Sequence, residues 1–328
     1  MESGGKHSRI LHVCAGWQPW NGAANIARMI AAEQEKAGCR VTLRTWAGIG
    51  ELRRADETWV HCAWMPCLWW AALWAKSLVW MPEGSYDPVR LAYHGWKKRL
   101  AAPVERWALR RADRVVATCE AEADWIRAYE LKIGKIEISD IKRFFSLNNS
   151  SPDWGHSPHA GWGHSPKSWG QSPQEEEKSW GQSPKKEGLT PVHLLYLGRE
   201  HPLKGLEYLK AAVDGIASGP SPECPVPPVE FRVVSSAFGE DKENIWKWCD
   251  ILSLPTLSDN FGLVVAEALE RGKTVITTDG APAWLDCGDF GGRLVCVRGY
   301  RDGDGETRIR LLRDALHDCL ARAGRRCG

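Results

Sequence analysis

Two carboxylates and the start of a helix lie close together in the segment 254–272. The sequence predicts a strand that ends at a short polar loop, and then a helix that begins at Gly262-Leu263. Asp259 lies in the loop, and Glu267 lies one turn beyond Leu263 on the same side of the helix. Backbone N–H groups at a helix start receive anions, and a glycine lets a ligand approach the backbone closely. The segment therefore predicts a site for a ligand with sugar hydroxyls and phosphates.

A second candidate site lies in the loop of YLGREHPLKGL, residues 196–206. A predicted strand ends at Gly198, and Arg199 and Lys204 follow it. Ligands of open α/β sheets bind at this carboxyl edge. A guanidinium and an ammonium there suit a diphosphate, although the same residues would also fit an exposed loop with ordinary surface charges.

Together the two motifs resemble the C-terminal domain of the GT-B, family-4 retaining glycosyltransferases, the group that builds bacterial polysaccharide and lipopolysaccharide. That family has a strand followed by G-R-x4-K-G, and later E-x7-E with F-G inside it. Arg199, Lys204 and Gly205 match the first motif. Asp259 and Glu267 have the spacing of the second motif, with Asp in place of the first Glu.

The resemblance implies a role for each matched residue. Arg199 and Lys204, with Gly205, would hold the donor pyrophosphate. The catalytic pair would be Asp259, which contacts hydroxyls of the transferred sugar, and Glu267, which binds the nucleotide ribose. The rest of the donor-binding set lies beside the donor sugar and phosphate: Asn260, Phe261, Gly262 and Leu263.

The implied reaction moves a sugar from a nucleotide-diphosphate sugar to an acceptor hydroxyl with retention, as a metal-independent hexosyltransferase does. The nucleotide sugar is a substrate, so no cofactor is expected, and Asp302-Gly303-Asp304 in a glycine-rich loop is not expected to bind a metal. The acceptor implied by the resemblance is a glycan or a lipid-linked sugar in cell-envelope polysaccharide synthesis.

The N-terminal half carries a looser resemblance on the acceptor side. Gly22, within Pro19–Ala23, stands where the family has a P-x-x-G-G loop, but Ala23 replaces the second glycine. Glu83 stands where many members have His or Arg, and an acid there could repel phosphates. These departures keep a second hypothesis open, a degenerate, non-catalytic nucleotide-sugar-binding scaffold. Another Rossmann-like enzyme is a third, although no GxGxxG follows the first strand.

Strands alternate with helices along most of the chain, which predicts an α/β fold of parallel sheets. We expect two Rossmann-like domains of the GT-B type facing a central cleft. Residues 1–145 would form the acceptor-side domain and residues 191–328 the nucleotide-sugar-binding domain. The stretch 206–229 is short for a full helix–strand–helix unit, which predicts a C-terminal sheet that lacks a strand.

Residues 146–190 would form a linker or surface insertion without a core. Four imperfect copies of WG[HQ]SP begin at 154, 162, 169 and 180. Their short, irregular periods exclude a solenoid, and their Pro, Gly and Ser content predicts disorder. Partner or sugar binding through the Trp residues is the alternative to a tolerated repeat expansion.

Charge and cysteine content exclude other classes of protein. The chain has 328 residues and a net charge of +2, which argues against a nucleic-acid partner. Its 11 cysteines form no CxxC pair, which indicates reduced thiols in a cytoplasmic protein, and no secretory signal is visible. The apolar run 62–81 is interrupted by Pro66 and Lys76, and it favours buried elements over a membrane span.

Residues 88–112 predict a long basic helix with Trp96, Leu100, Val104 and Trp107 on one face. We favour a packed Trp stripe beneath a solvated charged face. The alternative is peripheral contact of the basic 96–114 region with an anionic membrane, at its inner face. Pro103 is expected to bend or divide the helix.

Overall fold

A computed structural model describes residues 8–18, 21–93, 95–130, 132–133, 135–145, 178–180, 190–218 and 227–326. The chain divides into two compact units, residues 1–144 and 145–328. The WG[HQ]SP copies lie outside the described residues, apart from Trp180.

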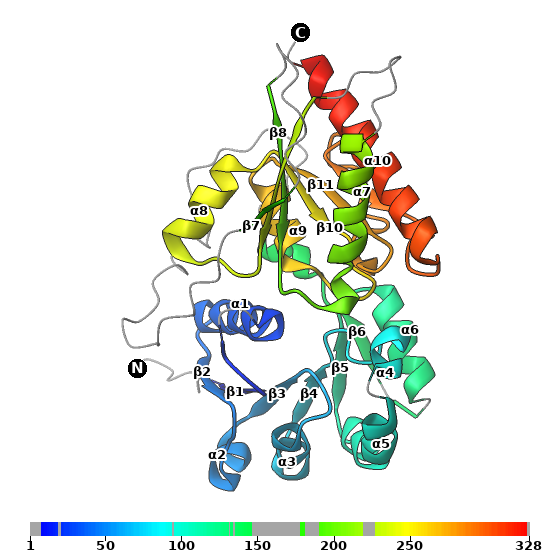
Figure 1. Ribbon diagram of the computed structural model, residues 1–328. Coiled ribbons are helices and arrows are strands. Elements are labelled where there is room, and N and C mark those ends of the chain that lie inside the picture. Colours follow the sequence, from blue (N-terminus) through cyan, green and yellow to red (C-terminus); the bar gives the residue numbers. More distant parts are fainter. Residues whose placement is uncertain are drawn as a thin grey trace. The chain divides into compact units, whose positions relative to one another are not determined.

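The N-terminal unit is built on a six-stranded parallel sheet in the order β2-β1-β3-β4-β5-β6 (Figure 1). Its strands are β1 (Arg9–Cys14), β2 (Arg40–Arg44), β3 (Glu57–His61), β4 (Leu78–Met81), β5 (Arg114–Ala117) and β6 (Ile136–Ile138). Its helices are α1 (Gly22–Lys36), α2 (Ile49–Arg54), α3 (Pro66–Trp74), α4 (Pro88–Ala92), α5 (Gly95–Arg110) and α6 (Glu120–Tyr129), followed by the short 3-10 helix η1 (Ile141–Phe144).

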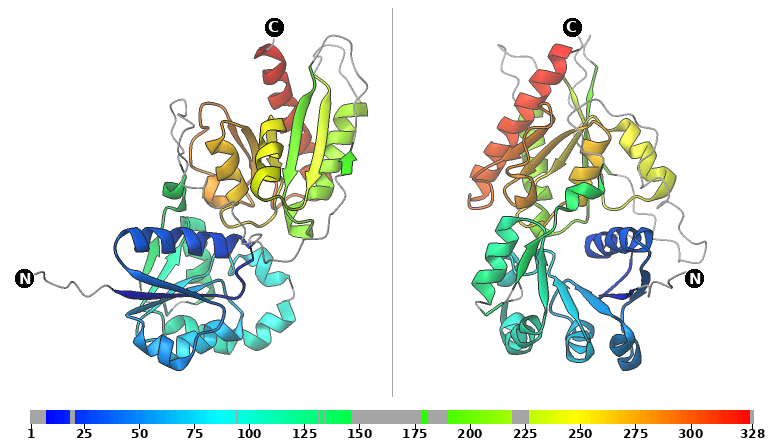
Figure 2. Two further views of the ribbon diagram at one scale, coloured as in Figure 1. Left: turned by 90° about the vertical axis from the view of Figure 1, so that its left-hand side faces the viewer. Right: turned by 180° about the vertical axis from the view of Figure 1, so that it is seen from behind.

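Helices cover both faces of this sheet. Helix α1 lies on one face, and α2, α3 and α5 lie side by side on the other (Figures 1 and 2). The apolar run 62–81 forms buried elements, as expected, because β4 is fully buried and α3 packs its alanines into the core. Helix α1 begins where Asn21 caps it by accepting a hydrogen bond from the Ala23 N–H.

The C-terminal unit has a second six-stranded sheet, in the order β12-β11-β10-β8-β9-β7. Its strands are β7 (Lys178–Trp180), β8 (Val192–Leu197), β9 (Val229–Val234), β10 (Ile251–Leu254), β11 (Thr274–Thr278) and β12 (Leu294–Val297). Its α-helices are α7 (Leu206–Ser218), α8 (Gly239–Trp248), α9 (Leu263–Glu270) and α10 (Gly305–Arg326), with the 3-10 helices η3 (Pro202–Lys204) and η4 (Pro282–Trp284). Helices α7 and α10 lie side by side on one face, and α8 and α9 lie on the other (Figures 1 and 2).

Two expectations about this unit need correction. The C-terminal sheet was expected to lack a strand, but its described part has six strands, and the sixth lies next to β9. That strand is β7, which comes from the segment expected to be a disordered linker and runs antiparallel to β9, with Ser179 opposite Arg232. The parallel α/β prediction is confirmed for both units, and the one antiparallel edge strand was not foreseen.

The basic region also differs from its prediction. Pro103 lies inside α5 without dividing it, and the interruption falls between α4 and α5 instead. The stripe on α5 is not packed: Trp96 is 62% exposed, Leu100 74% and Trp107 40%. The prediction of a packed Trp stripe was therefore wrong, because the buried side of α5 is a different one that carries Glu105, Ala108 and Leu109.

Candidate functional site

The loop between β10 and α9 is held in one conformation by hydrogen bonds from neighbouring loops. The carbonyl of Leu203 accepts the Leu257 N–H at 2.8 Å and the Thr256 hydroxyl at 2.9 Å. The Asp259 N–H donates to the Gly280 carbonyl at 2.7 Å. These bonds tie the Asp259 loop to the turns that follow β8 and β11, so its backbone is fixed before any ligand arrives.

Two glycines allow these turns to touch. A Cβ on Gly205 would lie 2.1 Å from the Pro255 carbonyl oxygen and 2.6 Å from the Tyr300 hydroxyl oxygen, and its φ is +62°. A Cβ on Gly280 would lie 2.0 Å from the Thr256 carbonyl oxygen. No other residue type fits either position without moving the backbone. The glycine of the G-R-x4-K-G pattern therefore has a structural reason to be there.

The start of α9 is anchored by aromatic packing. Phe261 is buried and stacks on Phe145 at 6.0 Å between ring centroids, and the Trp284 indole N–H donates to its carbonyl. Gly262 caps the helix with φ +63°, and Leu263 is the first helical residue. Asn260 is buried just before this turn. The N-terminus of α9 thus starts from a rigid base beside Asp259.

Lys204 and Asp259 form an ion pair between the two motifs. Both side chains are mostly buried, so the pair lies partly out of water. Arg199, earlier in the same loop, has an exposed side chain, and its carbonyl accepts the Tyr196 hydroxyl at 2.9 Å. The structure therefore brings Lys204, Gly205 and Asp259 together, and it leaves Arg199 open to solvent at the same edge of the sheet.

Glu267 has a partner that sequence reasoning missed. The ammonium of Lys242, on α8, lies 2.8 Å from both carboxylate oxygens of Glu267, on α9. The guanidinium of Arg271 donates to the Glu267 carbonyl at 3.1 Å. The residues around Lys242 form no recognisable motif. Its contact with Glu267 arises because α8 and α9 bring the two side chains together in the fold.

The acceptor-side residues lie on the N-terminal unit. Gly22 is the first residue of α1, and Pro19 and Trp20 lie outside the described residues. The Asn21 side chain donates to the Gly16 carbonyl at 2.8 Å and so closes the loop after β1. Glu83 follows β4 and has φ +53°, a conformation that residues other than glycine rarely adopt.

Glu83 is buried at the end of a chain of polar side chains. Its Oε1 lies 2.9 Å from Nδ1 of His61, whose Nε2 lies 2.9 Å from Nδ1 of His12. Nε2 of His12 lies 2.7 Å from Oε1 of Gln34, on α1. The Cys62 thiol lies 3.8 Å from Oε2 of Glu83. Neither imidazole is exposed to solvent.

Burial controls the charge of this chain. It raises the pKa of Glu83 well above its usual range, and the nearby Glu122 carboxylate raises it further. Burial lowers the pKa of His61 to about 3. Burial and the neighbouring His61 lower the pKa of His12 to about 3. The two imidazoles are therefore neutral near neutral pH, and the surroundings of Glu83 favour its protonated form.

The two histidines were not predicted. His12 is the buried polar residue of β1, and His61 and Thr58 are the buried polar residues of β3. The two strands pair in parallel with Cys14 opposite His61. A polar side chain in each of two apolar strands was the available signal, because side chains on one face of paired strands meet.

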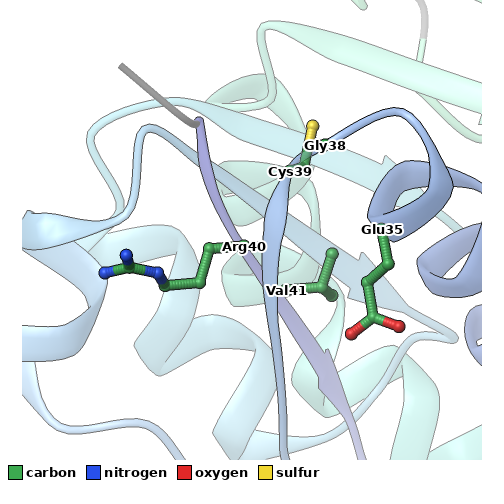
Figure 3. Close-up of a pocket in the computed structure, with 5 residues that line it drawn as sticks. All are labelled: Glu35, Gly38, Cys39, Arg40 and Val41. Carbon is green, nitrogen blue, oxygen red and sulfur yellow. The ribbon is translucent and has the colours of Figure 1, made fainter. Parts of the chain in front are cut away.

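No metal site of three or more His, Cys, Asp or Glu side chains is present among the described residues. Asp304 instead caps α10, and its carboxylate accepts the Thr307 N–H at 2.8 Å. A surface hollow lies at the end of α1 and the start of β2, lined by Glu35, Gly38, Cys39, Arg40 and Val41 (Figure 3). The side chains of Glu35, on α1, and Arg40, on β2, lie on opposite sides of β2 (Figure 3), and none of the predicted site residues lines this hollow.

Across the described part of the chain, no helix combines the length and the apolar character needed to cross a bilayer.

A family model and a curated protein that match this chain are both glycosyltransferases. Residues 13–138 match the model of the glycosyl transferase 4-like domain. A D-inositol 3-phosphate glycosyltransferase of Corynebacterium kroppenstedtii is 26% identical over 156 residues, covering 38% of this chain and 34% of the relative. The chain thus spans about a third of the length of that curated relative.

Solved structures match almost the whole chain. Sucrose-phosphate synthase of Thermosynechococcus elongatus aligns with 97% of this chain and 92% of its own at a TM-score of 0.60 and 14% identity. Anabaena HepE, solved with UDP, also aligns with 97% of this chain and 92% of its own, at a TM-score of 0.56 and 14% identity. WaaG, a glycosyltransferase involved in lipopolysaccharide biosynthesis, aligns with 97% of this chain and 94% of its own, at a TM-score of 0.54 and 13% identity. At these identities the likeness shows the fold.

Proposed function

We propose that this chain, which has the fold of the GT-B glycosyltransferases and a match to the glycosyl transferase 4-like domain, transfers a sugar from a nucleotide-diphosphate sugar to an acceptor hydroxyl. One observation carries the proposal. The two motifs, far apart in the sequence, meet at the carboxyl edge of one sheet as the pair Lys204–Asp259, beside the N-terminus of α9.

The donor would replace existing partners in this site. Its diphosphate would bind the Lys204 ammonium in place of Asp259, and Arg199 would be the second cation that binds it. The Asp259 carboxylate would then be able to accept hydrogen bonds from the transferred sugar. Glu267, held by Lys242, would accept hydroxyls of the ribose. Asn260, Phe261, Gly262 and Leu263 would lie beside the phosphates at the helix start, where backbone N–H groups favour negative charge.

Catalysis would rest on positioning and on stabilisation of the leaving diphosphate, with retention of configuration and without a metal. The fixed backbone of the Asp259 loop supports this, because preorganised groups do not have to reorganise during the reaction. Gly22 and Glu83 would belong to the acceptor side. UDP and UDP-glucose are the first probes, since HepE was solved with UDP and, in a second structure, with UDP and glucose.

We assign the acceptor to a glycan or lipid-linked sugar of the cell envelope, and we place the chain at the inner face of a membrane. The exposed stripe on α5 supports this placement, because Trp96, Leu100 and Trp107 recur on one side of the helix. The Lys97 ammonium lies over the Trp96 ring at 5.5 Å, and the Arg111 guanidinium over the Trp107 ring at 6.0 Å. Apolar and cationic groups side by side suit an anionic lipid surface.

A thermal-shift panel of UDP, GDP, ADP and their sugars tests the donor site. Wild-type protein should be stabilised by one nucleotide, by about 2.7 kcal/mol at a hundredfold its Kd. Lys204→Ala should lose this shift, and Lys247→Ala, an exposed lysine on α8, should keep it. Sugar transfer is then measured with that donor. Binding without turnover for any acceptor would favour the non-catalytic scaffold, and a shift unchanged in Lys204→Ala would refute the assigned site.

A further inference from the structure

The side chains of Gln34, His12, His61 and Glu83 form a hydrogen-bonded chain through the N-terminal unit, which the Cys62 thiol joins at Oε2 of Glu83. The three links measure 2.7, 2.9 and 2.9 Å. The chain starts on α1, crosses β1 and β3, and ends in the loop after β4. No feature of the proposed donor site uses the two histidines, so their presence in a core needs a separate explanation.

The first link sets the direction of the whole chain. The amide of Gln34 is oriented with Oε1 toward His12, and in this orientation the oxygen accepts and Nε2 of His12 donates. Nδ1 of a neutral His12 then accepts, and Nε2 of His61 must donate to it. Nδ1 of a neutral His61 accepts in turn, so the last hydrogen bond has to be donated by Oε1 of Glu83. A carboxylate beside two neutral imidazoles would leave one link without a proton.

The surroundings decide where the third proton resides. It can sit on Glu83, or on an imidazole that becomes a cation. Both rings are fully buried, and an imidazolium there would lose its hydration. The groups that face Glu83 from other elements are the thiols of Cys14 and Cys62, the carboxylate of Glu122 on α6 and the guanidinium of Arg90 on α4.

The Glu122 carboxylate is engaged with the same loop. It accepts the N–H of Gly84 with one oxygen, and the N–H and hydroxyl of Thr118 with the other, at 2.7 Å each. A negative charge held beside Glu83 by three donors disfavours a second one there.

We propose that Glu83 is held as a neutral carboxylic acid by a one-way chain of hydrogen bonds from Glu83 through His61 and His12 to Gln34. The chain holds three protons and has no net charge. The proposed function enters only through the acceptor-side role of Glu83, and the protonation state stands on the geometry alone. The loop after β4 would therefore present an uncharged acid at the acceptor side.

The tautomers of the two histidines test the proposal directly. Protein labelled with ¹⁵N at histidine is examined by NMR at neutral pH, with His12→Asn and His61→Asn used for assignment. Both rings should be neutral and protonated at Nε2. Infrared spectra should show the carbonyl band of a protonated carboxyl group in wild type, and the band should be absent from Glu83→Gln.

A pair of variants at Gln34 tests the direction of the chain. Gln34→Lys places a donor where the chain needs an acceptor, so both histidines should change to the Nδ1–H tautomer and the carboxyl band should disappear. Gln34→Glu keeps an acceptor at that place and should leave both signals unchanged. This matched pair separates the polarity of the chain from any general effect of a substitution on α1.

The proposal would be overturned by a His61 protonated at Nδ1 in wild type, by a doubly protonated ring, or by tautomers unchanged in Gln34→Lys. All these signals come from the ligand-free protein. Failure of the chain is therefore distinguishable from failure of the proposed transfer, which is measured with donor and acceptor.

Discussion

Single residues in this molecule are constrained by contact with backbone. Gly205 is the clearest case, because the turn before α7 and the loop after β10 touch at its Cα hydrogens. Gly299 offers a matched comparison, since its φ is +72° but a Cβ there would meet nothing within 4 Å.

Gly205→Ala should lower the free energy of unfolding by about 2–4 kcal/mol, from left-handed strain plus overpacking against Pro255. Gly299→Ala should cost only about 1–2 kcal/mol, from the backbone strain alone. Urea unfolding of both variants measures the difference. Equal losses would mean that the contact with the Pro255 carbonyl is relieved at no cost.

Residue chemistry also predicts how stability depends on pH. His12 and His61 have depressed pKa values of about 3 in the folded state. Their contribution to the free energy of unfolding is therefore fully present above pH 6.5 and is lost as the pH falls, because the unfolded chain then binds protons that the folded chain does not. Glu83 has a raised pKa, so its contribution is present below pH 4.5 and is lost as the pH rises. Each group changes stability by about 1.4 kcal/mol per pH unit within its window.

The contribution of this chain to stability should therefore fall by about 3 kcal/mol or more on going from pH 6.5 to pH 4.5, because the two histidine slopes outweigh the single opposing slope of Glu83. In wild type, the raised pKa of Glu83 makes stability fall as the pH rises above 4.5. The Glu83→Gln variant lacks this effect, so its free energy of unfolding relative to that of wild type should increase with pH above 4.5. Denaturant unfolding across this range measures both, with the exposed Glu120→Gln as control. Parallel curves for wild type and Glu83→Gln would contradict the raised pKa.

Helix α5 has one face that is buried in the N-terminal unit and one apolar face that is exposed. One side buries Glu105, whose carboxylate accepts the Tyr86 hydroxyl at 2.6 Å and the Trp69 indole N–H. The other side exposes the apolar stripe that begins at Trp96. An amphipathic helix ordinarily buries its apolar stripe, and here that stripe faces outward, so a surface outside this unit is its natural partner.

The double variant Trp96→Ala, Trp107→Ala should bind vesicles of anionic phospholipid about thirtyfold more weakly or worse, because each of the two buried indoles contributes on the order of 1 kcal/mol or more. Co-sedimentation measures this, and Trp46→Ala, an exposed Trp outside α5, is the control. Binding by wild type should also fall with added salt. An equal loss in the control variant would argue against a role specific to α5.

Most helices and strands could be predicted, because buried parallel strands appear as apolar runs and the helices between them have caps such as Asn21. Strand β7 could not, since three residues in a repeat-rich segment carry no periodic signal. The two site motifs were found from residue types and spacing. Lys242 and the histidine chain were missed, because their contacts depend on how separate elements pack.

At the scale of the whole molecule, the two units carry different chemistry. Every residue assigned to the donor lies in residues 145–328, and the buried His–Glu chain lies in residues 1–144. The proposed donor should therefore stabilise one unit and leave the other unchanged.

Calorimetry at pH 5 should resolve two transitions, with the lower one belonging to the N-terminal unit because acid weakens its histidine chain. A bound nucleotide should raise only the upper transition, by mass action. Glu83→Gln should move only the lower one. A nucleotide that shifts the lower transition alone would place the donor on the wrong unit.

Strand β7 has a consequence for how copies of this protein behave at high concentration. It pairs antiparallel with β9 and so occupies hydrogen-bonding groups at one edge of the C-terminal sheet. Without it, β9 would present an unpaired edge on which a second chain could add a strand. A shortened chain that lacks residues 146–190 should therefore self-associate through β9, whereas one that retains 178–180 should stay monodisperse. We therefore expect the three residues of β7 to help keep the chains apart.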